Sequence, residues 1–106
     1  MPDRAWKATE RRVGALLGGR RVPVTGRQRG SAPDVEHVDY SIEVKHRAKL
    51  PRWILEAMDQ ANKAASGAQL PIVVLHQSGD RFAEALVVIK LENFLALCPI
   101  MDDRET

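Results

Sequence analysis

One segment of the chain alternates between polar and apolar side chains: Tyr40-Ser41-Ile42-Glu43-Val44-Lys45-His46. An alternation with a period of two predicts a β-strand that is buried on one face. Ile42 and Val44 then point into a core, while Glu43 and Lys45 share the opposite face. The segment therefore predicts a carboxylate and an ammonium group side by side on the surface of a sheet.

The neighbouring segments predict three helices and four further strands. Asp3 is a suitable N-cap for the first helix, and two glycines stop it. Pro51 suits the first turn of a second helix that ends near Gly67. The order α-β-β-β-α-β-β-α predicts an α/β (α+β) fold, a mixed sheet covered by helices. Helices are expected at about 4–17, 51–67 and 92–97, and strands at 20–24, 34–37, 40–46, 71–76 and 85–89, the last two as a hairpin.

Length and composition indicate one small globular domain, spanning 1–106. The chain has 106 residues and a mass of 11.8 kDa, enough for a single core. Its 44% hydrophobic and 28% charged residues exclude collagen-like and wholly disordered proteins. Cys98 is the single cysteine, so an internal disulfide is excluded. We expect no membrane span, since no run approaches about 20 apolar residues, and a cytoplasmic location in a bacterial, archaeal or phage-infected cell.

Positive charge gathers in the first half of the chain. Residues 4–52 contain twelve Lys and Arg against five Asp and Glu, whereas residues 53–106 contain four against eight. This distribution favours a polyanionic partner, most simply nucleic acid, although a solvated basic face would give the same count. Arg27 and Arg29, flanked by glycines, either neutralise phosphates or form a solubilising loop. The expected DNA-binding zone further includes Arg20, Arg21, Arg47, Lys49 and Arg52.

Two carboxylates are expected to meet beside Lys45. Asp34 begins the preceding strand, and a short turn brings it next to Glu43. Paired carboxylates suit a hard divalent cation such as Mg²⁺, which polarises a phosphodiester for hydrolysis. Lys45 would then orient the attacking water or help to deprotonate it. The alternative is an exposed Glu43–Lys45 pair that contributes about 0.2–1 kcal/mol through neighbouring charges.

Two further polar residues stand on or beside apolar helix faces. Glu10 lies in the middle of the apolar stripe of the first helix, where an unpartnered carboxylate is costly to bury. It predicts either a salt bridge with Arg20 or Arg21, or a metal site at the edge of the core. Gln60 lies at the margin of the buried face of the second helix. It either satisfies a buried backbone group or helps to hold the catalytic strand and the substrate.

Together these motifs resemble the PD-(D/E)XK nuclease superfamily. They look most like the small Holliday junction resolvases of archaeal and phage type, and the resemblance covers nearly the whole chain. The segments that carry it are Thr9-Glu10-Arg11-Arg12, Arg21-Val22-Pro23, Pro33-Asp34, Ile42-Glu43-Val44-Lys45 and Asp59-Gln60-Ala61.

The resemblance implies a restriction-endonuclease-like core and a role for each motif residue. Asp34 and Glu43 would be metal ligands together with the carbonyl of Val44, and Lys45 would be the catalytic lysine. Glu10 would bind Mg²⁺ or Mn²⁺ directly or through water. Members usually act on branched DNA as homodimers, each subunit nicking one strand. The resemblance thus implies paired nicks in a four-way junction.

Other interpretations of the same residues stay open. The chain could be a replication-repair type nuclease acting on flaps or ends, or a non-catalytic DNA-binding module whose carboxylates form salt bridges. Trp53 is expected in the core or at a dimer surface. Ser31, the only serine between the first strand and Asp34, is assigned no role. The histidines show no ligand spacing, so structural roles are expected for His46 and the other two.

Overall fold

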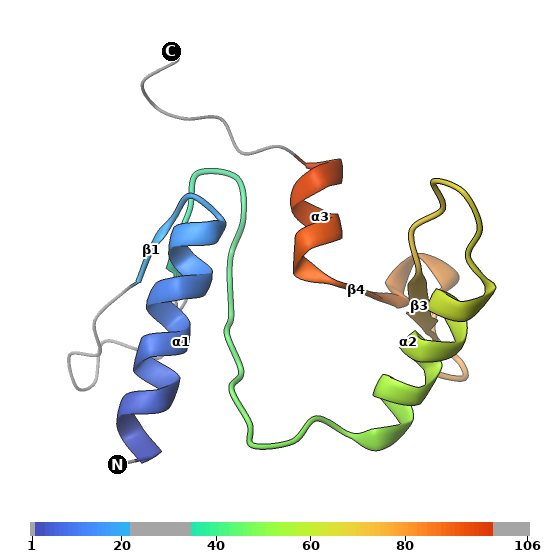
Figure 1. The fold of residues 1–106 in the computed structure, drawn as a ribbon, viewed down its shortest axis with the longest axis horizontal. Helices are drawn as coiled ribbons and strands as arrows, with labels where there is room; N and C mark the ends of the chain where they lie inside the picture. The colour runs from blue at the N-terminus through green and yellow to red at the C-terminus, as the bar shows by residue number, and fades with distance from the viewer. Residues whose placement is uncertain (1, 22–34, 99–106) are drawn as a thin grey trace. The chain divides into compact units, whose positions relative to one another are not determined.

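The computed structural model describes residues 2–21 and 35–98 (Figure 1). Two compact units are distinguished, one drawn mainly from Met1–Ala48 and the other from Lys49–Pro99. Each is described by itself. The described elements are α1 (Pro2–Leu16), β1 (Arg20–Arg21), β2 (Val35–Glu36), α2 (Arg52–Ala64), β3 (Ile72–Leu75), η2 (Phe82–Glu84), β4 (Leu86–Ile89) and α3 (Leu91–Leu97). This mixed helix and strand content confirms an α+β chain.

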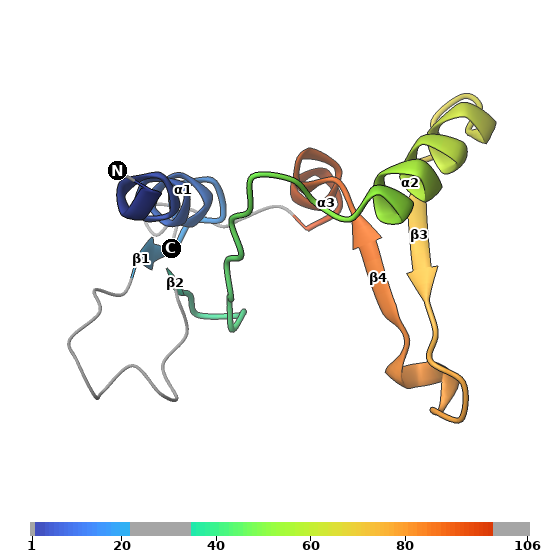
Figure 2. The same ribbon diagram turned by 90° about the horizontal axis from the view of Figure 1, so that it is seen from below.

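In the first unit, α1 packs against a short antiparallel strand pair (Figure 2). Gly18 ends the helix with a φ of 78°, a left-handed conformation that glycine adopts without steric cost. The amide of Gly19 then donates to the carbonyl of Gly14 at 2.8 Å. β1 pairs with β2 in the register Arg20↔Glu36 and Arg21↔Val35. The two glycines therefore turn the chain from the helix directly into the sheet that the helix covers.

The buried residues of this unit come from both α1 and β2. Val35 is fully buried, and Leu17, directly after α1, is 6% exposed. Trp6 and Val13 are partly buried on the same stripe of the helix, as its periodicity predicts. The start of the helix was predicted wrongly: α1 begins at Pro2, so Asp3 lies within it and is not its N-cap. Proline has no amide proton to lose in a first turn, which makes it a compatible start.

The segment 40–46 does not form the predicted third strand. It meets the sheet at one isolated antiparallel bridge, Val35↔Ile42, where the amide of Val35 donates to the carbonyl of Ile42 at 3.4 Å. β2 is described over two residues, and no strand is assigned to residues 43–46. The alternation itself is present, because Ile42 and Val44 are partly buried whereas Glu43 and Lys45 are exposed.

The second unit combines a β-hairpin with α2 and α3. Pro51 precedes α2, and its carbonyl accepts from the amide of Ile54 at 3.2 Å. Met58 is the buried residue of the helix, and α2 packs on β3. β3 and β4 pair antiparallel from Ile72↔Ile89 to Leu75↔Leu86, so the predicted hairpin is confirmed. The 3-10 helix η2, which lies between the two strands, was not predicted.

A single mixed sheet is not formed by the described residues. Their strands fall into two separate antiparallel pairs, β1–β2 and β3–β4. The apolar run of β3 predicts a central strand, but β3 has one strand partner in the described part of the chain, and Ile72 and Val74 are about half exposed. An apolar run indicates that both faces of a strand need to be covered, but it does not show which elements cover them.

The described helices have 15, 13 and 7 residues. None of them is both long and apolar enough to cross a bilayer.

Candidate functional site

Glu43 and Lys45 lie side by side on the exposed face of segment 40–46. Nζ of Lys45 is 3.2 Å from Oε2 of Glu43, and the two side chains are 71% and 58% exposed. The predicted shared face is confirmed. An ion pair this exposed contributes only about 0–1 kcal/mol to stability. Both charged groups are therefore open to a ligand in solvent.

The turn before this pair is held by side-chain contacts. Nδ1 of His37 accepts from the amide of Asp39 at 3.0 Å, and the rings of His37 and Tyr40 have centroids 4.7 Å apart. The predicted short turn between the second strand and segment 40–46 is thus confirmed. The turn returns the chain to β2, where Ile42 forms the bridge with Val35. Asp34, the predicted partner of Glu43, lies outside the described residues.

Glu10 is a buried carboxylate on α1. It is 3% exposed, and Leu17 lies buried on the same helix stripe. A charged group at this depth needs a compensating partner. Its predicted partners are an arginine of β1 or a metal ion. Neither the side chains of Arg20 and Arg21 nor a bound ion is described, so both interpretations of Glu10 remain predictions.

A hydrogen bond that the sequence analysis missed connects α1 to the segment of the pair. Oγ1 of Thr9 lies 3.0 Å from Nδ1 of His46, and the same oxygen donates to the carbonyl of Ala5 at 2.9 Å. Thr9 precedes Glu10, and His46 follows Lys45. No local pattern in the sequence pointed to this contact, since His46 is exposed and lies 37 positions from Thr9.

The described residues include two of the three predicted carboxylate ligands, of which Glu10 is buried and Glu43 is exposed. No group of three His, Cys, Asp or Glu suited to a metal ion is found within 2–21 and 35–98. The predicted set reaches beyond these ranges through Asp34. What the described part contributes is two carboxylates, Glu10 and Glu43, and the backbone carbonyl of Val44. Carboxylate and carbonyl oxygens are the donors that Mg²⁺ and Mn²⁺ take, so the donor chemistry fits such an ion.

The predicted DNA-binding residues are distributed over both units. Arg20 and Arg21 form β1, and Arg47 is exposed just after the candidate site. Arg27 and Arg29 lie outside the described residues. In the second unit Lys49, Arg52 and Gln60 are exposed, and Nε of Arg52 pairs with Oε1 of Glu56 at 3.3 Å. Both predicted roles of Gln60, a bond to a buried backbone group and help in holding the catalytic strand and substrate, remain predictions.

No protein-family model, curated protein or solved structure matches this chain. The functional assignment therefore depends on the residues and their geometry.

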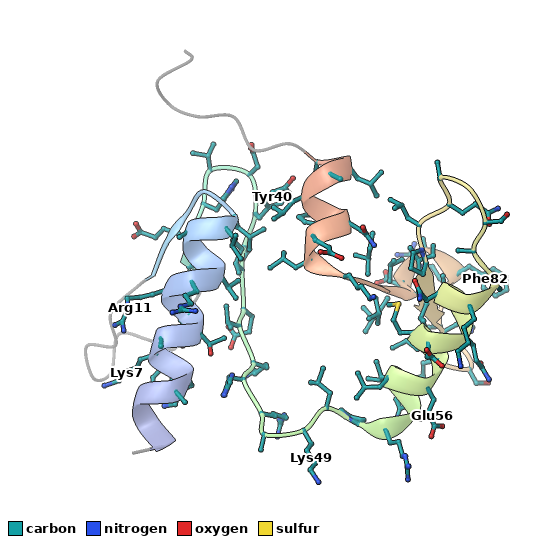
Figure 3. All side chains as sticks on the ribbon, viewed as in Figure 1. Lys7, Arg11, Tyr40, Lys49, Glu56 and Phe82 are labelled. Carbon is teal, nitrogen blue, oxygen red and sulfur yellow. The ribbon has the colours of Figure 1, made fainter. Side chains whose placement is uncertain are left out.

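Exposed side chains on the two units extend the description of the surface. Lys7 and Arg11 project from α1 on the side turned away from segment 40–48 (Figure 3), as the helical periodicity predicts. Trp53 is 57% exposed, which makes a core position wrong for it. A groove of about 350 Å³ runs between the end of α2 and the start of β3. Its lining carries no ionisable side chain and consists of Ala61, Ala64, Ala65, Gln69, Leu70, Pro71 and Ile72.

Proposed function

We propose that this chain is a divalent-cation-dependent DNA endonuclease of the PD-(D/E)XK type that makes paired nicks in four-way junctions. The observation that carries the proposal is the Glu43–Lys45 pair. Its carboxylate and ammonium group are 3.2 Å apart, and both side chains are exposed. Glu43 directly follows Ile42, which forms the antiparallel bridge. Such a pair offers an oxygen ligand for a cation and a positive charge for a phosphate in one accessible place.

The direction of the bridge supports a second carboxylate at the same place. In an antiparallel pair, the residue before one member and the residue after the other are the next to oppose each other. Val35 pairs with Ile42. Continuation of the pairing by one residue would set Asp34 opposite Glu43, and this supports the proposed meeting of the two carboxylates. Opposed residues in such pairs have Cβ atoms about 4.5–5.5 Å apart, a separation that one cation can bridge.

Each residue has a defined part in the proposed reaction. Asp34, Glu43 and the Val44 carbonyl hold the cation, and Glu10 binds it directly or through water. When bound, Mg²⁺ or Mn²⁺ supplies the Lewis acidity that polarises the phosphodiester. Lys45 orients the attacking water and offsets the negative charge that develops on the phosphate in the transition state.

Recognition in this proposal depends on shape and charge. The basic residues of the first half neutralise phosphates, which position a protein on DNA without reading its sequence. Paired incisions need two active sites, and a chain with one catalytic set obtains two as a C2 homodimer. A restriction-endonuclease-like core belongs to the same proposal.

A non-catalytic DNA-binding module is the second candidate function. It is favoured by the direct Glu43–Lys45 ion pair, in which each charge already has a partner. This candidate predicts DNA binding that does not depend on a divalent cation. It also predicts no strand cleavage under any metal condition.

Cleavage of a labelled mobile four-way junction with Mg²⁺ and with EDTA tests the proposal. We expect symmetric paired nicks near the branch point with Mg²⁺ and none with EDTA. Lys45→Ala and Asp34→Asn should each lower the cleavage rate by about 10²–10³-fold, the size of effect seen when one group that stabilises the transition state is removed. Junction binding should largely persist, because most phosphate contacts remain.

The matched control is Lys63→Ala. Lys63 forms an equally exposed ion pair with Asp59, at 2.9 Å, on the surface of α2. This variant should cut at the wild-type rate. Normal cleavage by Lys45→Ala and Asp34→Asn would show that the site is misassigned. Preferential removal of flaps would instead support the replication-repair type of nuclease, and binding without cleavage would support the non-catalytic module.

A further inference from the structure

The Thr9–His46 hydrogen bond has a defined direction. Oγ1 of Thr9 is 2.9 Å from the carbonyl oxygen of Ala5 and 3.0 Å from Nδ1 of His46. A threonine hydroxyl has one proton to donate, and a carbonyl oxygen can only accept. Both contacts are satisfied together only when Nδ1 of His46 carries a proton and donates it to Thr9. With the Thr9 proton assigned to the Ala5 carbonyl, the proton of His46 is assigned to Nδ1.

The bond links α1 to the segment that carries the exposed pair. His46 is itself exposed, and it follows Lys45 directly. The antiparallel bridge at Ile42 and the bond at His46 lie on either side of Glu43 and Lys45 in the chain. The pair therefore belongs to a stretch that contacts other parts of the first unit at both of its ends.

We propose that Thr9 and His46 are positioning residues whose hydrogen bond clamps segment 42–46 to α1 and fixes the Glu43–Lys45 pair for catalysis. The catalytic part of this inference rests on the proposed function. Thr9 is adjacent to the buried Glu10, so the clamp joins the helical turn of one predicted ligand to the segment of another. Reacting groups tolerate little displacement, since a shift of about 1 Å can cost about 10²-fold in rate.

Four variants separate the clamp from the general structure. Thr9→Val and His46→Leu remove the bond, whereas Thr9→Ser keeps a hydroxyl and His46→Asn keeps a donor near the Nδ1 position. On a four-way junction with Mg²⁺, we expect the first two to lower kcat by about tenfold, with KM changed by less than about twofold. Thr9→Ser and His46→Asn should restore most of the rate.

A double variant and a spectrum complete the test. Because both residues act through one bond, Thr9→Val/His46→Leu should be no slower than the slower single variant. In alkaline solution, imidazole ¹⁵N shifts should place the proton of His46 on Nδ1 in the wild type and less so in Thr9→Val.

The outcomes distinguish this inference from the proposed function. Wild-type cleavage together with wild-type kcat in Thr9→Val and His46→Leu would overturn the clamp and leave the nuclease proposal intact. Absence of metal-dependent cleavage in the wild type would overturn the nuclease proposal, and the positioning role with it. A proton on Nε2 of His46 in the wild type would overturn the assigned direction of the bond, because Nδ1 would then accept from the Thr9 hydroxyl.

Discussion

Glu10 is a buried carboxylate with two predicted roles, a metal ligand or the partner of an arginine in a salt bridge. Its carboxylate is 3% exposed, and removal of its charge has opposite consequences for a ligand and for an ion pair. If Glu10 helps to hold Mg²⁺, Glu10→Gln should lower metal affinity by about 10–100-fold. The measurement is the thermal stability with and without Mg²⁺, since a cation at about 100 times its Kd stabilises the wild type by about 2.7 kcal/mol.

The control for Glu10→Gln is the metal-free protein. A metal ligand predicts that the variant loses the Mg²⁺-dependent gain while its stability in EDTA stays near that of the wild type. A salt bridge with Arg20 or Arg21 predicts the reverse, a loss of about 3–5 kcal/mol without metal because a buried partner is left uncompensated. A variant that retains the full Mg²⁺-dependent gain would remove Glu10 from the metal site.

Single residues were predicted well where the cause is local. The parity of 42–46 follows from the geometry of an extended chain, and the structure confirms that Glu43 and Lys45 share the exposed face. The Thr9–His46 bond was missed because it joins residues 37 positions apart. The bond forms only because α1 packs near segment 40–46, and local patterns in the sequence do not show which helix packs there.

At the level of elements, helices and the hairpin follow the sequence closely because their hydrogen bonds are local. α2 and α3 begin within one residue of their predicted starts, and β3–β4 pair as an antiparallel hairpin. The third strand was predicted wrongly for the described residues. Segment 40–46 is assigned only the bridge between Ile42 and Val35, and the residues before Val35 lie outside the described ranges.

The connection between α1 and β1 is an element that a single methyl group should disrupt. A Cβ on Gly19 would collide with the carbonyl oxygen of Glu36 and lie 2.7 Å from Cγ1 of Val35, which is fully buried. We expect Gly19→Ala to destabilise the protein by about 1–3 kcal/mol, the usual cost of overpacking. Urea denaturation measures this change as a lower midpoint at an unchanged slope.

A second glycine provides the comparison for this substitution. Gly67 has a φ of 60° but nothing within 4 Å of an added Cβ, and asparagine tolerates that conformation better than most residues do. Gly67→Asn should therefore change stability by no more than about 0.5 kcal/mol. Equal stability of Gly19→Ala and the wild type would mean that α1 and the β1–β2 pair do not pack as closely as described.

Across the whole molecule, the feature that is clearest in the sequence is the asymmetry of charge. Basic residues outnumber acidic ones by twelve to five over 4–52, and the order reverses beyond residue 53. The α+β class could be predicted because it needs only the succession of local patterns. The pairing of strands across a whole sheet could not be predicted from local patterns, since it depends on contacts between distant segments of the chain; the described strands pair as β1–β2 and β3–β4.

The charge asymmetry leads to a measurable property of the whole molecule, the salt dependence of junction binding. Each phosphate contact contributes about −0.9 to the slope of log K against log salt concentration. If Arg27 and Arg29 each contact a phosphate, Arg27→Ala/Arg29→Ala should make the slope less steep by about 1.8. Arg81→Ala is the control, because Arg81 is exposed but already paired with Glu84 in the hairpin turn. An unchanged slope in the double variant would identify the loop as solvated surface, and the basic half of the chain would then need to bind DNA through its other arginines and lysines.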